Sequence, residues 1–209
     1  EVPTGDILGF RANDALRLGQ QDMGVRVQWS LQHLHHAAGL HYPAGVHDSH
    51  AFGDLAGGFC FLNNSAIAAE AMLRAGRRPA ILDVDVHHGN GTQGIFYARA
   101  DVLTVSIHAD PARFYPFFWG HAEERGTGAG LGYNLNLALP RGTDDASYLE
   151  ALDIALARIR AFGTDALVVA LGLDAHEGDP FQGFRVTTPG FARIAGAIAG
   201  LGLPSVIVQ

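Results

Sequence analysis

Acidic and imidazole side chains gather in residues 81–93, which read ILDVDVHHGNGTQ. Asp83, Asp85 and His87 alternate there with apolar residues, as they would on a β-strand. Residues two apart on a strand point to the same side, so we expect Asp85 and His87 to face one point together. Charges at a buried strand end are costly unless a partner compensates for them. The segment therefore predicts either a bound cation or a structural ion-pair network.

A third donor of the same kind is Asp174, which follows another apolar segment. Two carboxylates and one imidazole with a coordination position left open are typical of a catalytic divalent metal site, and Zn²⁺ suits them. A zinc ion held in this way lowers the pKa of bound water to about 7 and polarises a carbonyl group. An ion-pair network would need cationic partners, but the chain has only 14 lysines and arginines, and none stands beside the ends of these strands. We therefore favour the metal site.

The elements that must position these residues alternate along the chain. The sequence predicts helices over residues 64–75, 144–162 and 189–200, and strands over residues 80–86, 102–108, 166–173 and 205–208. Continuously apolar strands separated by helices are typical of a parallel sheet covered on both faces. The expected fold class is thus α/β, a three-layer sandwich with a mostly parallel central sheet. Sites in such sheets form beyond the carboxyl ends of the strands, where Asp85 and His87, His108, and Asp174 with His176 are expected.

Length and composition limit the classes of function. The 209 residues suit one domain that spans residues 1–209. The formal charge of −7 without a Lys/Arg cluster excludes direct nucleic-acid binding, and no apolar run approaches the roughly 20 residues of a membrane helix. Eleven histidines are many for this length and point weakly to metal chemistry. The single cysteine, Cys60, permits no internal disulfide and suits a cytoplasmic protein.

Five motifs in order carry a family resemblance. They are GFCFLNN at residues 58–64, LDVDVHHGNG at 82–91, TVSIH at 104–108, GLGYNLNL at 130–137 and GLDAHEGDP at 172–180. Together they resemble the histone deacetylase and acetylpolyamine amidohydrolase family, and the likeness covers most of residues 43–209. The resemblance implies a zinc-dependent amide hydrolase with the arginase/deacetylase fold. It also implies that Asp85, His87 and Asp174 hold the zinc ion.

The resemblance assigns roles to residues around the metal. Asp83 matches a carboxylate behind the ligands, which also helps to bind a structural K⁺ ion with Ser106 and the backbone of Ile107. Asn90 matches a residue that orients an active-site histidine. We expect Asp179 to support its loop, or the surroundings of the metal, through hydrogen bonds.

The family's catalytic base and acid are two adjacent histidines followed by alanine. His50 lies nine residues before Phe59, which fits the second of them, but Ser49 stands where the first is expected. His47 is the candidate for the vacant place. An alternative is the literal run His35-His36-Ala37, although its alanine lies 22 residues before Phe59 in the GFCF motif, which is further than expected. We predict His50 as the base with His47 beside it.

Family sites are reached through a narrow tube with aromatic walls. Phe59 matches one wall, and the second is expected from FYPFFWG, where we favour Phe118 with Phe117 as its neighbour. Two facing rings suit the methylene chain of an acyl-polyamine, another small acylated amine or an acetyl-lysine side chain. Relatives of this kind are often homodimers, so a dimer is expected here as well.

The chain departs from the family pattern near its end. The family places an oxyanion-stabilising tyrosine, in a Gly-Gly-Tyr motif, just after the strand that matches residues 205–208, and this chain stops at Gln209. We therefore expect a domain truncated at both ends, inactive or weak alone and active at full length. Two other functions stay open. One is a metal-binding domain that has lost catalysis, which Ser49 favours, and the other is a binuclear manganese ureohydrolase on the same sheet.

Overall fold

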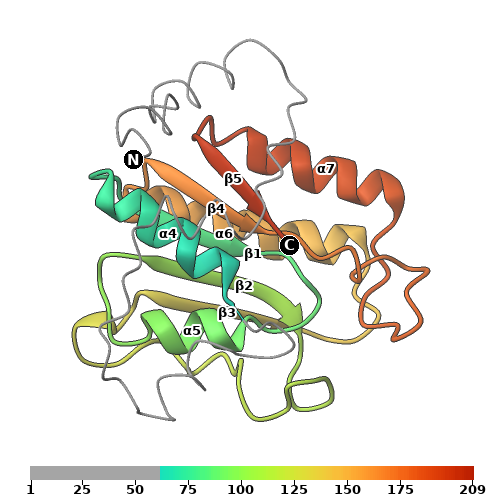
Figure 1. Cartoon of the computed structure of the whole chain (residues 1–209). Helices are drawn as coiled ribbons and strands as arrows, with labels where there is room; N and C mark the ends of the chain where they lie inside the picture. Colours follow the sequence, from blue (N-terminus) through green and yellow to red (C-terminus); the bar gives the residue numbers. More distant parts are fainter. Residues whose placement is uncertain (1–61) are drawn as a thin grey trace, which may run out of the picture.

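The structure, a computed structural model, describes residues 62–209. In this part of the chain, five strands form one sheet in the order β3-β2-β1-β4-β5, and every neighbouring pair is parallel (Figure 1). The strands are β1 (Pro79–Asp83), β2 (Leu103–Ala109), β3 (Asn134–Leu139), β4 (Ala166–Ala170) and β5 (Ser205–Val208). The expected α/β class with a parallel central sheet is confirmed.

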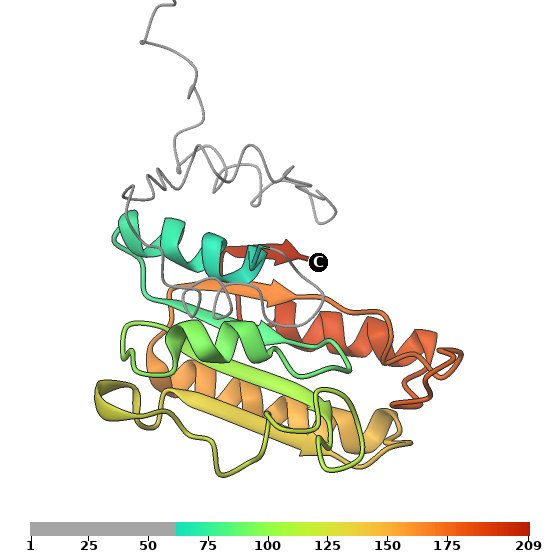
Figure 2. The same cartoon turned by 60° about the horizontal axis from the view of Figure 1, so that its bottom comes forward.

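Helices cover both faces of the sheet (Figure 2). One face carries α4 (Asn64–Arg74) and α5 (Asn90–Phe96), and the other carries α6 (Asp145–Phe162) and α7 (Thr188–Ala199). Alternate residues of β1 divide between the two layers, because Ile81 belongs to the apolar cluster under α4 and α5 while Ala80 and Leu82 belong to the cluster under α6. This two-sided burial explains why the strands read as continuous apolar runs.

Side-chain caps set where the helices begin. The Asn63 side chain accepts the Ala66 N–H at the start of α4, and Asp144 and Thr187 cap α6 and α7 in the same way. The helix α6 ends at Gly163, which has the left-handed φ of 73° that glycine adopts readily. Within residues 62–209, no helix combines the length and the apolar character needed to cross a bilayer.

Two predicted strands end earlier than expected. Strand β1 ends at Asp83 rather than at residue 86, and β4 ends at Ala170 rather than at residue 173. The Asp83 carboxylate accepts the Asp85 N–H at 3.1 Å, which gives that amide a local partner in place of a neighbouring strand. Asp85 and His87 therefore lie in a bend after the strand.

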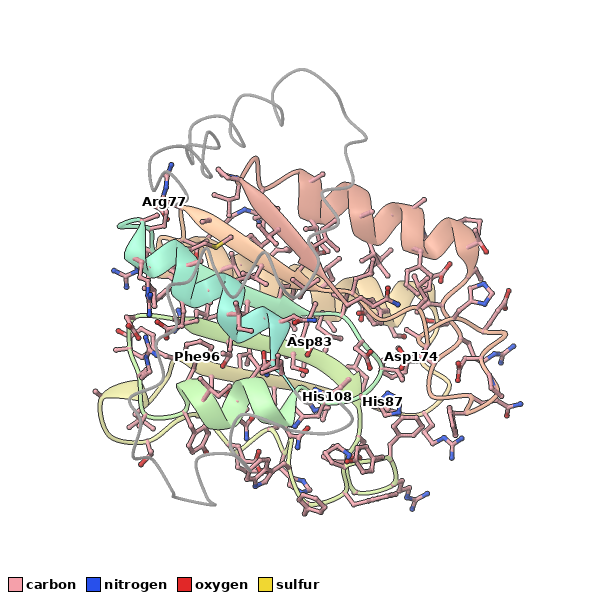
Figure 3. All side chains as sticks on the ribbon, in the orientation of Figure 1. Arg77, Asp83, His87, Phe96, His108 and Asp174 are labelled. Carbon is pink, nitrogen blue, oxygen red and sulfur yellow. The ribbon has the colours of Figure 1, made fainter. Side chains whose placement is uncertain are left out.

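The metal-site candidates lie where the order of the strands reverses. Strands β1, β2 and β3 follow one another in one direction, whereas β4 lies on the other side of β1. Such a switch point leaves a crevice beyond the carboxyl ends of the two central strands. Asp83, His87, His108 and Asp174 lie toward this end of the sheet, and Arg77 lies at the opposite end (Figure 3).

A candidate metal centre

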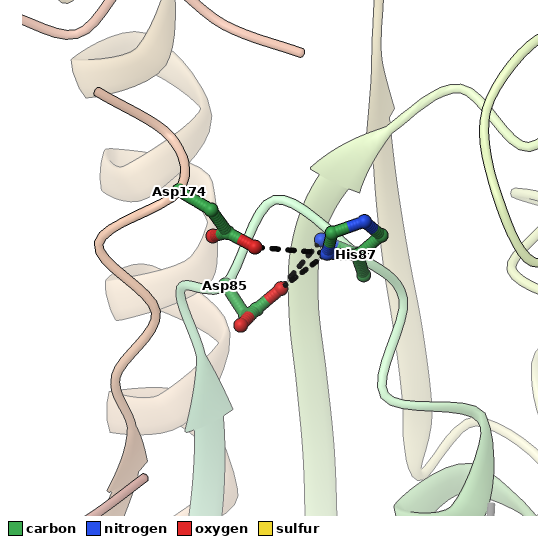
Figure 4. A group of neighbouring side chains, drawn as sticks. All are labelled: Asp85, His87 and Asp174. Carbon is green, nitrogen blue, oxygen red and sulfur yellow. Dashed lines mark hydrogen bonds and ion pairs between the residues drawn. The ribbon is translucent and has the colours of Figure 1, made fainter. Parts of the chain in front are cut away.

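The structure brings together the three ligands predicted from the sequence. Donor atoms of Asp85, His87 and Asp174 all lie within 4.8 Å of one another, and no other such group of three occurs in residues 62–209. Nδ1 of His87 is 2.8 Å from Oδ2 of Asp174 and 3.1 Å from Oδ1 of Asp85 (Figure 4). The imidazole edge thus faces both carboxylates across one small space.

Backbone amides of the bend after β1 hold the two carboxylates in place. Oδ1 of Asp85 accepts the His87 N–H at 2.7 Å, and Oδ1 of Asp174 accepts the Val86 N–H at 3.0 Å. The expectation that Asp85 and His87 share one side of a regular strand was therefore wrong in its geometry. The two residues meet because the chain turns after Asp83 and the carboxylates bond to the turned amides.

Close approach of the segment after β4 depends on a glycine. A Cβ atom on Gly172 would stand 2.3 Å from Oδ2 of Asp85 and 2.7 Å from Oδ1 of Asp174. Both distances are shorter than any side chain tolerates. The absence of a side chain at Gly172 therefore lets the backbone lie against both carboxylates.

One proton, carried by His87, compensates the negative charges of the Asp85 and Asp174 carboxylates. Hydrogen bonds that His87 donates to Asp174 and then to Asp85 raise the pKa of His87 to about 9, against an ordinary 6.5. Burial acts to raise the pKa of Asp174, but the hydrogen bonds from His87 and from the Val86 N–H outweigh it, and the net shift is downward. Behind them, burial and the Asp85 charge raise the pKa of Asp83 well above its ordinary value.

The donor set fits a divalent ion. Two carboxylates and an imidazole are ligands that zinc and related metals prefer, and each is half-buried at the wall of a cavity. Within residues 62–209, neither Asp85 nor Asp174 forms an ion pair with lysine or arginine, and His87 is the cationic partner of both. A dication would take the place of the shared proton, held by Asp85, His87 and Asp174.

Metal affinity should rise with pH because His87 must lose its proton before its nitrogen can bind. With a pKa near 9 in the metal-free protein, each pH unit below 9 is expected to weaken binding about tenfold. Competition with a chelating indicator at pH 6, 7 and 8 measures this slope. A binding constant that stays the same across this range contradicts the prediction.

In the metal-free protein the hydrogen bonds between His87 and the two carboxylates stabilise folding below pH 6.5, and that contribution is lost as pH rises through 9.

A cavity of about 810 Å³ opens beside the three ligands. Four aromatic side chains line it, namely Phe114, Tyr115, Phe117 and Phe181. The ring centroid of His87 is 5.1 Å from that of Phe114, 6.2 Å from that of Tyr115 and 6.4 Å from that of Phe181. An apolar chain that reached the metal centre would pass between these rings.

One predicted wall residue is replaced by its neighbour. Phe118 is 67% exposed, contacts the Trp119 ring and does not line the cavity, whereas Phe117 does. The left-handed backbone of Phe117, with φ of 66°, sets the direction of the two rings. The other predicted wall, Phe59, lies outside the described residues.

The remaining site predictions have mixed outcomes. Asn90 begins α5 and lines the cavity. Asp179 supports its loop, because its carboxylate accepts the Phe181 N–H at 2.8 Å. His176 bonds to Thr188 and stacks on Phe191, so it does not join the metal group. The predicted base and its partner, His50 and His47, lie outside the described residues, as do His35 and His36.

Asp83 and Ser106 are direct neighbours across β1 and β2, as a shared cation site requires. A second cavity, of about 10 Å³, lies between them, roughly the space of one water molecule. Ser106 Oγ is also 2.8 Å from Nδ1 of His108, which is fully buried and bonds on its other side to the Gly120 carbonyl. His108 therefore serves the packing behind the site rather than the metal group.

A buried polar network, which the sequence did not indicate, supports the site from α5. Oε1 of Gln93 accepts hydrogen bonds from His88, Asn134 and Asn136 at 2.8–3.0 Å. Its Nε2 donates to Glu124, whose carboxylate also accepts the Gly120 N–H. Burial, and then His108, lowers the pKa of His88 to about 3, so His88 is neutral in this network. The network ties the segment after the metal ligands to the loop that carries the aromatic wall.

Removing the acceptor at the centre of this network should destabilise the fold. Gln93→Leu leaves three buried donors without their common acceptor, and we expect a loss of about 3 kcal/mol in the free energy of unfolding. Urea denaturation of the two proteins checks this, and equal slopes show that the unfolded states are comparable. A loss under about 1 kcal/mol would show that water replaces Gln93 at little cost.

Several functional candidates escaped the sequence prediction. Tyr115 and Phe114 stand in the stretch searched for a wall residue, but nothing in that stretch distinguishes them from the exposed rings. Phe181 lies in the loop between Asp174 and α7. Gly172, by contrast, could be predicted, because a glycine two residues before a predicted ligand lets the backbone approach the site closely, and the structure confirms that approach.

The chain is similar in sequence to known proteins over most of its length. Residues 27–208 match the histone deacetylase domain family. An acetylpolyamine amidohydrolase of Burkholderia pseudomallei is 54% identical over 160 residues, which cover 77% of this chain and 47% of that protein. Acetylpolyamine amidohydrolase 2 of Pseudomonas aeruginosa is 52% identical over 161 residues, with the same coverage.

The fold is shared with solved structures. The crystal structure of the acetylpolyamine aminohydrolase from Burkholderia pseudomallei superposes with a TM-score of 0.70 at 56% identity, covering 73% of this chain and 44% of that one. The chain spans about half the length of the curated relatives it matches. The family match covers most of its residues, and the candidate ligands and the parallel sheet lie within that match. The chain belongs to the histone deacetylase domain family.

Proposed function

We propose that the full-length protein is a zinc-dependent amide hydrolase that removes acetyl groups from acetylated polyamines and similar small amines. The observation that carries the proposal is the group of Asp85, His87 and Asp174 at the end of an aromatic-lined cavity. The names of the relatives at 52–54% identity support the substrate class. The size of the cavity and its apolar rings suit a slender methylene chain that leads to an amide.

The residues of this chain divide the work in the proposed reaction. Asp85, His87 and Asp174 hold the ion, which when bound acidifies water and polarises the acyl carbonyl. The aromatic rings align the chain of the substrate and keep water away from it. His50 is the proposed general base, with His47 beside it and Asn90 as its orienting partner. Asp83 and Ser106 are the proposed holders of a structural K⁺ ion.

An activity panel on the full-length protein tests the proposal. The substrates are acetylputrescine, acetylspermidine and an acetyl-lysine peptide, each with and without a chelator, and with zinc restored after chelation. We expect hydrolysis of the two acetylated polyamines that the chelator abolishes and zinc restores. Preference for the peptide would place the enzyme with protein deacetylases instead.

Elemental analysis distinguishes the two other functions. One metal per chain with no hydrolysis of any acylated amine would indicate a binding domain that has lost catalysis. Two divalent metal ions per chain, with K⁺ left out of the count, would indicate the ureohydrolase. The proposed location is the cytoplasm and the proposed assembly is a homodimer, which size-exclusion chromatography with light scattering would check.

A further inference from the structure

One arginine joins the two loops that carry the aromatic wall. Arg141 lies between β3 and α6 and lines the cavity. Its Nη2 donates to the Phe181 carbonyl at 2.7 Å and to the Gln182 carbonyl at 3.4 Å. The centre of the same guanidinium lies 5.5 Å from the centroid of the Phe114 ring. The Arg141 side chain thus contacts the Phe181 loop at two backbone carbonyls and the Phe114 loop at the face of an aromatic ring.

The two loops that Arg141 joins both contact the imidazole of His87. Phe114 approaches it from the loop after β2, and Phe181 from the loop after Asp174. A Cβ atom on Gly183 would stand 3.1 Å from the Phe114 ring, so the loops touch directly at this glycine. Any shift of the Phe181 loop therefore changes the position of Phe114 and the width of the cavity beside the metal group.

Only a guanidinium makes this set of contacts. Its planar fork can donate to carbonyl groups while its face lies over an aromatic ring, whereas a lysine ammonium is a point charge on a flexible stem. The hydrogen bonds also come from a charged donor, and such bonds are stronger than neutral ones. The identity of residue 141, beyond its charge, therefore determines how firmly the loops are held.

We propose that Arg141 is a positioning residue that sets the spacing of the aromatic walls and thereby the length of amine chain that the enzyme prefers. The part of the proposal that concerns amine chain length rests on the function proposed above. The part that concerns the spacing of the aromatic walls rests on the contacts of Arg141 alone. Lysine at position 141 keeps the charge and loses the fork, so Arg141→Lys separates positioning from electrostatic attraction.

The experiment compares full-length wild type, Arg141→Lys and Arg185→Lys. Arg185 is a matched control because it is exposed, belongs to the loop between β4 and α7 that carries Phe181, and does not line the cavity. The substrates are monoacetylated diamines with three, four and five methylenes. For Arg141→Lys we expect KM to rise roughly tenfold for the preferred substrate, because that is the effect of losing one charge-assisted hydrogen bond. The kcat should stay within about twofold of the wild-type value. The preference among chain lengths should flatten, and Arg185→Lys should match wild type.

Hydrogen exchange supplies a readout that does not depend on activity. In Arg141→Lys, exchange should accelerate in peptides that cover residues 111–120 and 178–185 and stay unchanged in β1 and β4. Unchanged exchange in both loops would overturn the positioning role. Faster exchange with unaltered KM and chain-length preference would overturn the claim on specificity. If wild type hydrolyses none of the diamines, the proposed function fails, and the exchange result still decides whether Arg141 holds the loops.

Discussion

Asp174→Asn should abolish tight metal binding and hydrolysis in the full-length protein. The substitution removes one of two anionic donors and also the partner that holds His87 Nδ1 at 2.8 Å. Loss of an outer partner of a metal ligand costs roughly 10–100-fold in affinity or activity, so loss of a ligand itself should exceed the upper end of that range. Metal content after dialysis and initial rates on acetylputrescine measure both effects.

A surface aspartate supplies the matched control for Asp174→Asn. Asp153 is exposed on α6 and does not line the cavity, so Asp153→Asn should retain full metal content and rate. Retention of one metal per chain and of near-normal turnover by Asp174→Asn would remove this residue from the ligand set. The control tests whether a less negative net charge alone changes metal uptake.

Gly172→Ala is the second substitution with a large expected effect, although it adds one methyl group only. The new carbon would stand 2.3 Å from Asp85 and 2.7 Å from Asp174, so both carboxylates, or the backbone between them, must move. We expect metal affinity and activity to fall by about 10–100-fold, as for other changes that misplace a ligand. Titration with a chelating indicator measures the affinity.

Gly196→Ala provides a contrast in the same protein. A Cβ atom on Gly196 meets nothing within 4 Å, and the residue lies inside α7. Alanine there should raise the free energy of unfolding by about 0.5–1 kcal/mol and leave metal binding as it is. If Gly172→Ala also binds metal with wild-type affinity, the carboxylates are more adaptable than their contacts indicate.

The metal group could be predicted from the sequence because its members are close in the chain or end an apolar strand. The three donors could be identified without knowledge of the turn that brings them together. The mechanism of that convergence was predicted wrongly, since the Asp83 side chain takes the Asp85 amide and ends β1 early. A side chain that competes for backbone groups is not visible in an alternating apolar pattern.

Two elements could not be predicted because contacts distant in sequence stabilise them. Strand β3 buries Asn134 and Asn136, and the side-chain amides of both donate to Gln93. Gln93 stands more than forty residues earlier in the chain than either asparagine. Helix α5 is only seven residues long and contains two glycines, a composition that local propensity disfavours. The choice between Phe117 and Phe118 depended on a left-handed residue, which the pattern of aromatic residues does not reveal.

The three donors come from two strands whose sequence separation is large. Asp85 and His87 follow β1, and Asp174 follows β4, 87 residues after His87. An ion shared by them acts as a reversible cross-link between the two halves of the sheet. Ligand binding to the folded state alone stabilises a protein by about 2.7 kcal/mol at a hundredfold excess over the dissociation constant. If zinc is that ion, as we propose, the heat resistance of the protein should follow the free zinc concentration around it, and withholding zinc would shorten the lifetime of the folded protein.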